Sequence, residues 1–194
     1  MNLRVISILG RKGSGKTTLS VEFMKRFGGR VIFFSPVADT SFQTGEVWDY
    51  DEIVPAMEGM KNGDVLAVKI ADVDALDMVC QQAIYDGQGF VIIIDEVDLY
   101  AKSKYLETCV HYCRHANLVL IANTRRYVHI PRIFTSQSDL FCIFGTHEPA
   151  DLEYLRKLGG KEIVETVQGL GPYHYLLMDT SAHGDTGVYI TEKG

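Results

Sequence analysis

The chain carries a glycine-rich segment whose residue types and spacing suit the binding of phosphate groups. Residues 10–18 read Gly-Arg-Lys-Gly-Ser-Gly-Lys-Thr-Thr and fit the pattern G-x-x-x-x-G-K-[ST]. Glycines let successive backbone N–H groups turn inward around phosphate oxygens, and a helix that begins near Lys16 would add the positive end of its dipole. We predict that Lys16 reaches the β- and γ-phosphates of a nucleotide and that the Thr17 hydroxyl is a ligand of Mg²⁺. The predicted nucleotide-binding residues are Gly10, Arg11, Lys12, Gly13, Ser14, Gly15, Lys16, Thr17 and Thr18.

Two carboxylates, Asp95 and Glu96, directly follow the apolar stretch 90–94. An aspartate at the carboxyl end of a buried strand beside a phosphate loop is placed to hold Mg²⁺. Glu96 is placed to accept a proton from a water that attacks the γ-phosphate, so we predict that it is the general base. The alternative is a solvated acidic turn. Asp98 could act similarly, but we expect it to be a helix N-cap.

Polar residues also frame the later apolar stretch 117–122. Asn123 follows it and is a candidate to position the attacking water and to contact the γ-phosphate. Arg114 precedes it, at the opposite end of the expected strand from Asn123, where it cannot reach the phosphate loop of its own chain. We predict an arginine finger that Arg114 supplies to a neighbouring subunit, with a surface salt bridge as the equally weighted alternative. Arg125 and Arg126 are the next candidates for that catalytic role.

The apolar pattern predicts the elements that must position these residues. Continuous apolar stretches alternate with helical patterns, which is typical of a parallel sheet covered by helices on both faces. The expected strands are 4–9, 31–34, 65–70, 90–94, 117–122, 140–144 and a terminal β pair at 173–178 and 188–190. The expected helices are 16–27, 73–85, 101–115 and 149–158. Segment 39–60 is expected to be irregular, with Trp48 and Tyr50 as packing anchors.

The composition is that of a soluble globular domain. Of the 194 residues 46% are hydrophobic and 23% are charged, which excludes a disordered chain, and we expect one domain over 1–194. The net charge of −6 argues against a generally basic surface for nucleic acid, although a local basic stripe is compatible with it. No apolar run approaches the ~18 residues of a membrane span, so we expect an intracellular, cytoplasmic protein.

The cysteines are expected to be reduced, as is usual inside cells. Cys109, His111, Cys113 and His115 alternate along an expected helix, where residues two positions apart point to different faces. We therefore expect ordinary helix packing rather than a metal site there.

Taken in order, these segments resemble the FtsK–HerA superfamily of P-loop ATPases, and most of all the genome-packaging ATPases of tailless viruses with an internal membrane. The first two motifs, known as Walker A and Walker B, are shared with many NTPases. The more specific features are Arg114-His115 before a strand, a polar residue after it, and segment 130–141 with Asp151-Leu152 beyond. One departure is Asn123, where the family usually carries a glutamine, so the amide reaches one methylene less far.

The resemblance implies a three-layer P-loop NTPase fold of the RecA/ASCE type, with a central, mostly parallel sheet and a short C-terminal β extension. It implies a homo-oligomeric ring, hexameric by expectation, that hydrolyses ATP with Mg²⁺ at subunit interfaces. Such a ring drives double-stranded DNA through its pore and packages a viral genome, with capsid or portal proteins as partners and the host cytoplasm or a virion vertex as its place. The candidate DNA contacts lie in loops 97–105 and 124–132 and are Lys102, Lys104, Arg125, Arg126 and Arg132.

Three other interpretations stay open. A small-molecule or nucleoside kinase suits the length of the chain, although no lid or substrate-base motif stands out. An assembly or secretion ATPase that moves protein or filamentous virions suits the motifs, although many of these carry a membrane span. A nucleotide-binding scaffold without turnover conflicts with the presence of Glu96. The sequence contains no recognisable base pocket, so it predicts neither adenine specificity nor the stoichiometry of a ring.

Overall fold

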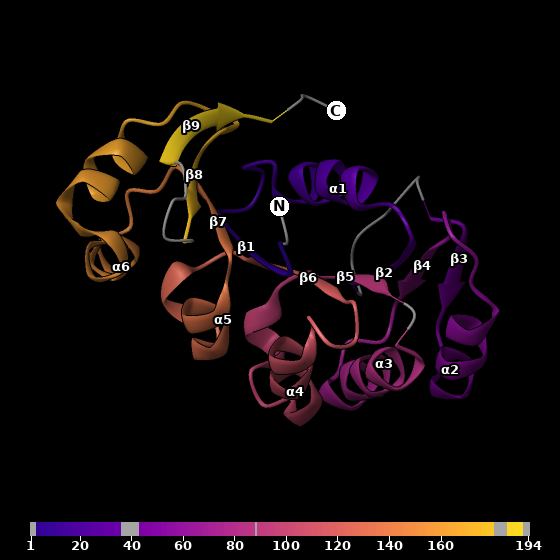
Figure 1. Ribbon diagram of the computed structural model, residues 1–194. Coiled ribbons are helices and arrows are strands. Elements are labelled where there is room, and N and C mark those ends of the chain that lie inside the picture. Colours follow the sequence, from indigo (N-terminus) through magenta and orange to yellow (C-terminus); the bar gives the residue numbers. More distant parts are fainter. Residues whose placement is uncertain (1–2, 36–42, 88, 181–185, 192–194) are drawn as a thin grey trace.

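A central β-sheet runs through the whole molecule (Figure 1). The structure is a computed structural model that describes residues 3–35, 43–87, 89–180 and 186–191. Within these ranges nine strands form one sheet in the order β3-β4-β2-β5-β6-β1-β7-β8-β9. The strands are β1 (Val5–Leu9), β2 (Arg30–Phe34), β3 (Gly45–Val47), β4 (Val65–Val68), β5 (Phe90–Ile94), β6 (Val119–Thr124), β7 (Leu140–Phe144), β8 (His174–Asp179) and β9 (Thr186–Ile190). Neighbouring strands from β3 to β7 in this order are parallel, and β8 and β9 add an antiparallel pair at one end.

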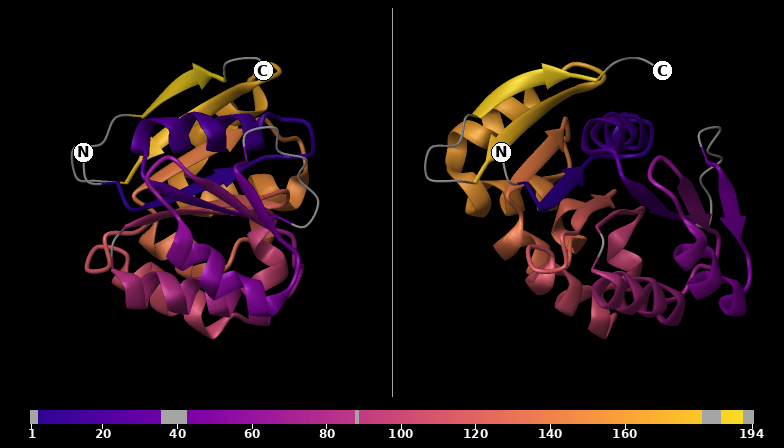
Figure 2. Two further views of the ribbon diagram at one scale, coloured as in Figure 1. Left: turned by 90° about the vertical axis from the view of Figure 1, so that its right-hand side faces the viewer. Right: turned by 45° about the vertical axis from the view of Figure 1, so that its right-hand side comes forward.

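Helices cover both faces of the sheet (Figures 1 and 2). The α-helices are α1 (Lys16–Phe27), α2 (Tyr50–Gly59), α3 (Val73–Asp86), α4 (Lys104–Tyr112), α5 (Arg132–Gln137) and α6 (Pro149–Gln168). Two short 3₁₀ helices are η1 (Val97–Tyr100) and η2 (Tyr127–His129). Helix α1 packs on one face, and buried side chains of α2 to α6 join a separate apolar cluster on the other.

Successive side chains of the buried strands point alternately into these two clusters, which explains why these strands are continuously apolar. In β1, Ile6 and Ile8 pack with Leu19 of α1, whereas Val5 and Leu9 belong to the cluster on the opposite face. A strand that is buried on both faces needs apolar side chains at every position. The predicted three-layer α/β fold with a mostly parallel sheet and a terminal β pair is thereby confirmed. The extent of the domain over 1–194 stays a prediction.

The prediction for segment 39–60 was wrong. Its described part, from residue 43 onward, contains β3 and α2 instead of irregular chain. Trp48 is 66% exposed and Tyr50 is exposed as well, so neither is a packing anchor. The side chains that anchor this part are Ile53 and Met57, four residues apart on one face of α2 and both fully buried. Polar neighbours and Pro55 within the helix mask this spacing in the sequence.

Other boundaries also differ from the expectation: β4 ends at Val68 and not at residue 70, and β6 is shifted by two residues, so that Asn123 lies within the strand. The helix expected at 101–115 begins at Lys104 and ends at Tyr112, after the separate turn η1. Asp98 lies inside η1 and is not a helix N-cap; the N-cap of α4 is Ser103, whose Oγ accepts a hydrogen bond from the Leu106 N–H at 3.0 Å. Helix α6 continues past its expected end at residue 158, with a kink at Gly159 and Gly160. The short helix α5 was not predicted.

Cysteines and histidines separate on α4 and the turn after it. Cys109 and Cys113 are buried, whereas His111 and His115 are exposed, as the alternation of faces predicts. None of the helices in the described ranges combines the length and the apolar character that a membrane crossing requires.

Candidate active site

Three adjacent strands end at one edge of the sheet, and each end carries one of the predicted motifs. Strand β6 lies between β1 and β5, and all three are parallel. The phosphate loop therefore follows β1, Asn123 lies near the end of β6, and Asp95 and Glu96 follow β5 at the same edge. The Gly10 N–H donates to the Thr124 carbonyl oxygen at 3.1 Å, which joins the start of the phosphate loop to the end of β6.

The phosphate loop has a backbone that only glycine adopts without strain. Gly13 has φ of +79° and Gly15 has φ of +105°, both in the left-handed region. A side chain at Gly10 would meet the Ser14 Oγ at 2.5 Å and the Phe144 Cβ at 2.9 Å. Gly15 is the N-cap of α1 and offers no side chain to cap the first turn, so the N–H groups of that turn are left for an anion.

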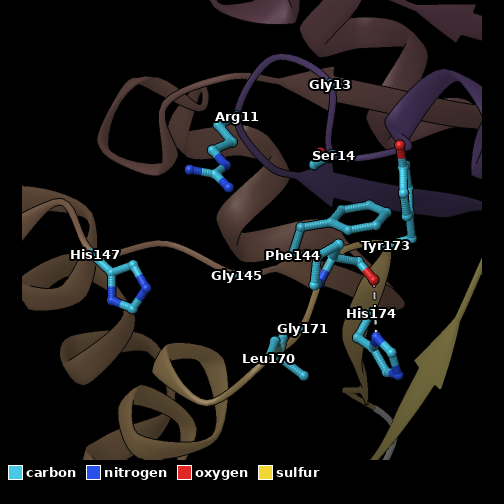
Figure 3. Close-up of a pocket in the computed structure, with 11 residues that line it drawn as sticks. Arg11, Gly13, Ser14, Phe144, Gly145, His147, Leu170, Gly171, Tyr173 and His174 are labelled. Atoms are coloured by element: carbon cyan, nitrogen blue, oxygen red, sulfur yellow. Dashed lines mark hydrogen bonds between the residues drawn. The ribbon is translucent and has the colours of Figure 1, made fainter.

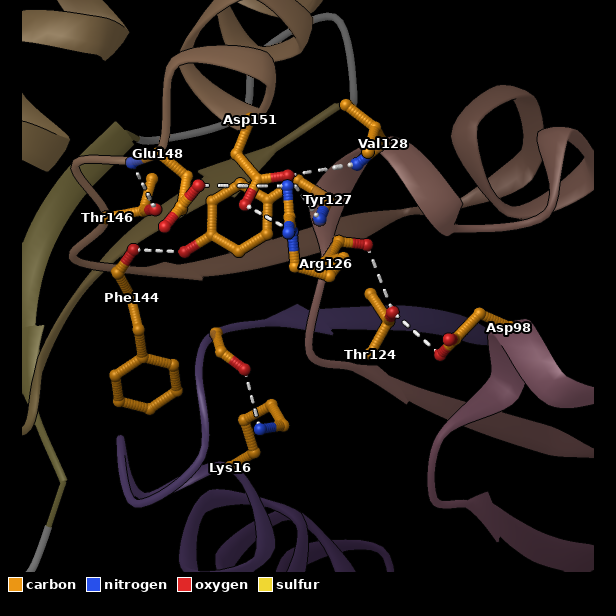
Figure 4. Close-up of polar contacts among 11 residues, drawn as sticks. Lys16, Asp98, Thr124, Arg126, Tyr127, Val128, Phe144, Thr146, Glu148 and Asp151 are labelled. Carbon is orange, nitrogen blue, oxygen red and sulfur yellow. Dashed lines mark hydrogen bonds and ion pairs between the residues drawn. The ribbon is translucent and has the colours of Figure 1, made fainter.

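Lys16 folds back over this loop. Its side chain is buried, and Nζ donates to the carbonyl oxygens of Gly10 at 2.6 Å and Arg11 at 3.1 Å (Figure 4). Burial lowers the pKa of Lys16, while the nearby carboxylates of Asp95 and Glu96 act in the opposite direction. The ammonium thus lies at the centre of the site, where an incoming phosphate would meet it.

The residues expected to hold Mg²⁺ are of the right chemical kind. Asp95 Oδ2 lies 3.4 Å from the Ser35 hydroxyl, which donates to it, and the carboxylate is only partly buried. Thr17 is the second residue of α1 and is exposed. A carboxylate and a hydroxyl are hard oxygen donors, which suit Mg²⁺ together with water and phosphate oxygens.

Glu96 has a left-handed backbone with φ of 53°, which is uncommon for a residue that is not glycine. Such a conformation stores strain and is often found at functional sites. The Glu96 carboxylate forms an ion pair with Arg125, which comes from the loop after β6. The predicted general base is therefore in contact with one of the predicted catalytic arginines of its own chain.

Asn123 is fully buried and has an amide nitrogen without a partner. Its Oδ1 accepts a hydrogen bond from the Ser20 hydroxyl at 3.0 Å, whereas Nδ2 bonds to no atom of the described residues. The buried Ser14 Oγ in the phosphate loop is likewise without a partner there. Buried donors of this kind are costly unless a ligand or water satisfies them. Both suit phosphate oxygens, so the polar atoms of the site fit a bound nucleotide.

A network that the sequence did not predict fixes the loop after β6 (Figure 4). Asp151 of α6 is 1% exposed and accepts hydrogen bonds from the backbone N–H groups of Tyr127 at 3.0 Å and Val128 at 3.3 Å. Its second oxygen pairs with Arg126 Nε at 3.3 Å. The Tyr127 hydroxyl, whose pKa burial raises, donates to the Phe144 carbonyl oxygen. The sequence signals for Asp151 were its place in the first turn of a helix and its part in the family resemblance, and neither indicated these partners.

The same loop is joined to the segment that carries Glu96. The Thr124 hydroxyl donates to Asp98 Oδ1 at 2.9 Å and lies 3.1 Å from the Arg126 carbonyl oxygen. Asp98 therefore binds the end of β6 to η1, a role other than the predicted helix cap. This contact joins the segment after β5 to the end of β6.

Arg114 lies where the sequence placed it, before β6 and away from the phosphate loop. Its side chain is 68% exposed and pairs with Asp139 at 3.3 Å. It is thus engaged in a surface salt bridge in the single chain, and a role in a neighbouring subunit stays a prediction.

The candidate DNA contacts lie on neighbouring loops. A hollow of about 220 Å³ is lined by residues of both loops, among them Ala101, Ser103 and Arg132. Lys102, Lys104 and Arg132 are exposed, and no carboxylate of the described residues pairs with them. Arg125 and Arg126 differ from these three, because Arg125 pairs with Glu96 and Arg126 pairs with Asp151.

A cavity of about 180 Å³ adjoins the phosphate loop on the side of the C-terminal strands (Figure 3). Arg11, Gly13 and Ser14 line it from the loop. The opposite wall comes from two segments far along the chain, with Phe144, Gly145, His147, Leu170, Gly171, Pro172, Tyr173 and His174. The Tyr173 ring approaches Gly15 so closely that a Cβ there would lie 3.4 Å from it. No sequence motif joins these segments, which is why the cavity was not predicted.

One family model and several solved structures match this chain. Residues 2–182 match the family model described as Poxvirus A32 protein. The genome packaging NTPase B204 from Sulfolobus turreted icosahedral virus 2 superposes with TM-scores of 0.80 in complex with sulfate and 0.81 in complex with AMPPCP. Its sequence is 24% and 23% identical in these two structures, and the match covers the whole of this chain and 98% and 100% of that one.

The plasmid coupling protein TrwB, in complex with GDPNP, is more distant. It has a TM-score of 0.66 and 10% identity, over 97% of this chain and 85% of that one. No protein with a curated function matches the sequence. The predicted P-loop NTPase fold and the resemblance to genome-packaging ATPases are confirmed.

The buried role of Asp151 can be tested by stability. We expect Asp151→Ala to lower the free energy of unfolding by about 1–3 kcal/mol, since two backbone N–H groups lose their acceptor and Arg126 loses an ion-pair partner. Glu148→Ala removes a neighbouring exposed carboxylate that lies 3.9 Å from Arg126, and should cost less than about 1 kcal/mol. Urea denaturation measures both, and equal losses would contradict the network.

Proposed function

The chain belongs to the Poxvirus A32 protein family, and we propose that it is an ATP-hydrolysing motor that translocates double-stranded DNA and packages a viral genome into a capsid. The observation that carries the proposal is the meeting of a phosphate loop, an Asp-Glu pair and a buried amide, whose nitrogen has no partner among the described residues, at three adjacent strand ends. The fold shared with a genome packaging NTPase and with a plasmid coupling protein supports it. We also propose capsid or portal proteins as its partners. The proposed location is the host cytoplasm or a virion vertex.

In this proposal each part of the site has one chemical task. The N–H groups of residues 13–18 and Lys16 Nζ bind the phosphates of ATP. Thr17 and Asp95 would hold Mg²⁺, which neutralises charge that develops on the phosphate oxygens. Glu96 accepts the proton of the attacking water, and the Asn123 amide donates to the water or to the γ-phosphate.

The nucleoside is proposed to lie in the cavity beside the phosphate loop. The cavity shares Arg11, Gly13 and Ser14 with the loop, so a nucleotide whose phosphates lie on the loop can extend directly into it. Tyr173 and His174 contribute aromatic rings to its lining (Figure 3). Aromatic faces bind any base by stacking, so this wall supplies affinity for the base rather than a choice of adenine.

Substitution of Tyr173 separates recognition of the base from recognition of the phosphates. Stacking is worth about 1–3 kcal/mol per base, so Tyr173→Ala should weaken ATP binding roughly 5- to 150-fold. Tyr173→Phe keeps the ring and should bind ATP as the unaltered protein does. Calorimetric titration with ATP and with inorganic tripolyphosphate measures both. An equal loss for the two ligands would show that Tyr173 supports the phosphate loop instead.

Hydrolysis is proposed to occur at the interfaces of a homo-oligomeric ring, with six subunits as the expected number. Arg114 of one subunit would exchange its own Asp139 for the transferring phosphate of the next subunit. This exchange is easy, because a largely exposed ion pair contributes little free energy and a guanidinium binds phosphate at least as well as carboxylate.

A mixing experiment tests this shared site. Lys16→Ala and Arg114→Ala should each abolish turnover when pure, whereas Arg114→Ala should still bind ATP. In a mixture, Arg114 of a Lys16→Ala subunit can complete the intact phosphate site of an Arg114→Ala neighbour, so partial activity should return. Arg114→Ala mixed with the Lys16→Ala, Arg114→Ala double variant is the control, because neither chain in that mixture can donate Arg114. Full activity of pure Arg114→Ala would contradict the role of Arg114 as the arginine finger and would leave Arg125 and Arg126 as the candidates.

The whole proposal is tested by the ATPase rate measured with and without double-stranded DNA, together with the oligomer size. We expect duplex DNA to stimulate release of inorganic phosphate in an oligomeric form, and Glu96→Gln to bind ATP without turnover because it has lost its base. A rate that is insensitive to DNA and to Glu96→Gln would contradict the proposal. Transfer of phosphate to a metabolite instead of water would indicate a kinase.

A further inference from the structure

The end of strand β9 lies against the phosphate loop. Thr191, the residue after β9, is 3% exposed, although Val188, Tyr189 and Ile190 before it are exposed. A Cβ built on Gly15 would lie 3.1 Å from the Thr191 Oγ1, so the threonine side chain fills the space beside this glycine. Gly15 is the N-cap of α1, whose first-turn N–H groups are left for an anion. A residue far along the chain thus contacts the phosphate loop where its helix begins.

Thr191 also holds the backbone of Tyr173. The Thr191 N–H donates to the Tyr173 carbonyl oxygen at 3.0 Å, and the Thr191 hydroxyl donates to the same oxygen at 3.4 Å. Tyr173 has a left-handed backbone with φ of 62°. This conformation is costly for a residue other than glycine and persists only where the surroundings fix it. The two hydrogen bonds from Thr191 contribute to that fixation, and they therefore help to place the Tyr173 ring beside the loop (Figure 3).

A row of aromatic rings keeps β9 in this position. Phe144, Tyr175 and Tyr189 are aligned across β7, β8 and β9. Their ring centroids are 5.5 Å apart for the first pair and 6.0 Å apart for the second. The row begins at the phosphate loop, because a Cβ at Gly10 would lie 2.9 Å from the Phe144 Cβ. Side chains two positions apart share one face of a strand, so Thr191 follows Tyr189 on the side of the sheet where the phosphate loop lies.

We propose that Thr191 is a positioning residue of the nucleotide site, which holds Gly15 for the phosphates and Tyr173 for the base. The inference rests on the proposed function and adds the C-terminal strand β9 to the elements that hold ATP. Thr191 acts through these two residues, and its contacts with them lie apart from the groups proposed to bind Mg²⁺ and the attacking water. Its loss should therefore weaken the binding of ATP and leave the chemical step unchanged.

Preorganisation is the reason why such a contact affects affinity. Glycines such as Gly13 and Gly15 can adopt many backbone conformations. An anion site made of backbone N–H groups binds tightly only when these groups converge before the ligand arrives. A side chain packed beside Gly15 removes alternative conformations of the loop. Loss of Thr191 therefore lowers the affinity for the phosphates and for the base, whereas loss of the Tyr173 ring lowers the affinity for the base.

The test is calorimetric titration of Thr191→Ala and Thr191→Ser with ATP and with inorganic tripolyphosphate. Thr191→Ala should bind both ligands roughly 3- to 10-fold more weakly, which is the effect of losing about one hydrogen bond. Thr191→Ser keeps the hydroxyl and should bind both ligands as the unaltered protein does. Thr186→Ala is the matched control, because Thr186 is an exposed threonine at the other end of β9; its binding should not change.

Steady-state kinetics separates positioning from catalysis. In Thr191→Ala the KM for ATP should rise by the factor seen in binding, with kcat unchanged. A fall in kcat at unchanged KM would overturn the inference, since Thr191 would then act on the chemical step. Unchanged affinity of Thr191→Ala for tripolyphosphate would overturn it as well, and so would a loss in Thr191→Ser as large as in Thr191→Ala. An unaltered protein that binds tripolyphosphate without hydrolysing ATP contradicts the proposed function, and the titrations still decide this inference.

Discussion

The site depends on the parallel register of β5, β6 and β1. Parallel pairing aligns Ile94 with Ala122 and Leu9 with Thr124, so the three segments that leave these strands begin within two residues of one another along the sheet. Because each strand is buried on both faces, a shift of one residue would exchange the side chains of two different cores. The fold therefore fixes the relative positions of the phosphate loop, the Asp-Glu pair and Asn123 before any nucleotide binds.

The end of β6 connects this fixed arrangement to the segments around it. Four consecutive residues have four different partners: Asn123 contacts Ser20, Thr124 contacts Asp98, Arg125 contacts Glu96, and Arg126 contacts Asp151. The contact between Asn123 and Ser20 is buried, and each of the other three involves at least one side chain that solvent reaches. A change at the nucleotide can thus pass through one short segment to η1, to α6 and to the cationic loops, which is what a motor requires of its site.

The sequence predicted what depends on local pattern and missed what depends on tertiary contact. Apolar runs predicted every strand except β3 to within about two residues, and the glycine spacing predicted a loop between β1 and α1. Helix α2 was missed because Pro55 and polar neighbours mask the spacing of Ile53 and Met57. The prediction for Asp98 was wrong because Glu96 has a left-handed backbone, which no residue type in this turn indicates. The partners of the two arginines and the cavity wall near Tyr173 come from distant segments, so no local signal precedes them.

In the proposed function, hydrolysis at these strand ends moves the protein along duplex DNA. The most direct measurement is the displacement of a triplex-forming oligonucleotide from a DNA duplex, followed in real time by fluorescence. We expect displacement of the oligonucleotide with ATP and none with AMPPCP. The delay before displacement should grow with the distance of the triplex from the DNA end. Rapid DNA-stimulated hydrolysis without any displacement would contradict it, since the chain would then be an ATPase that responds to DNA without moving along it.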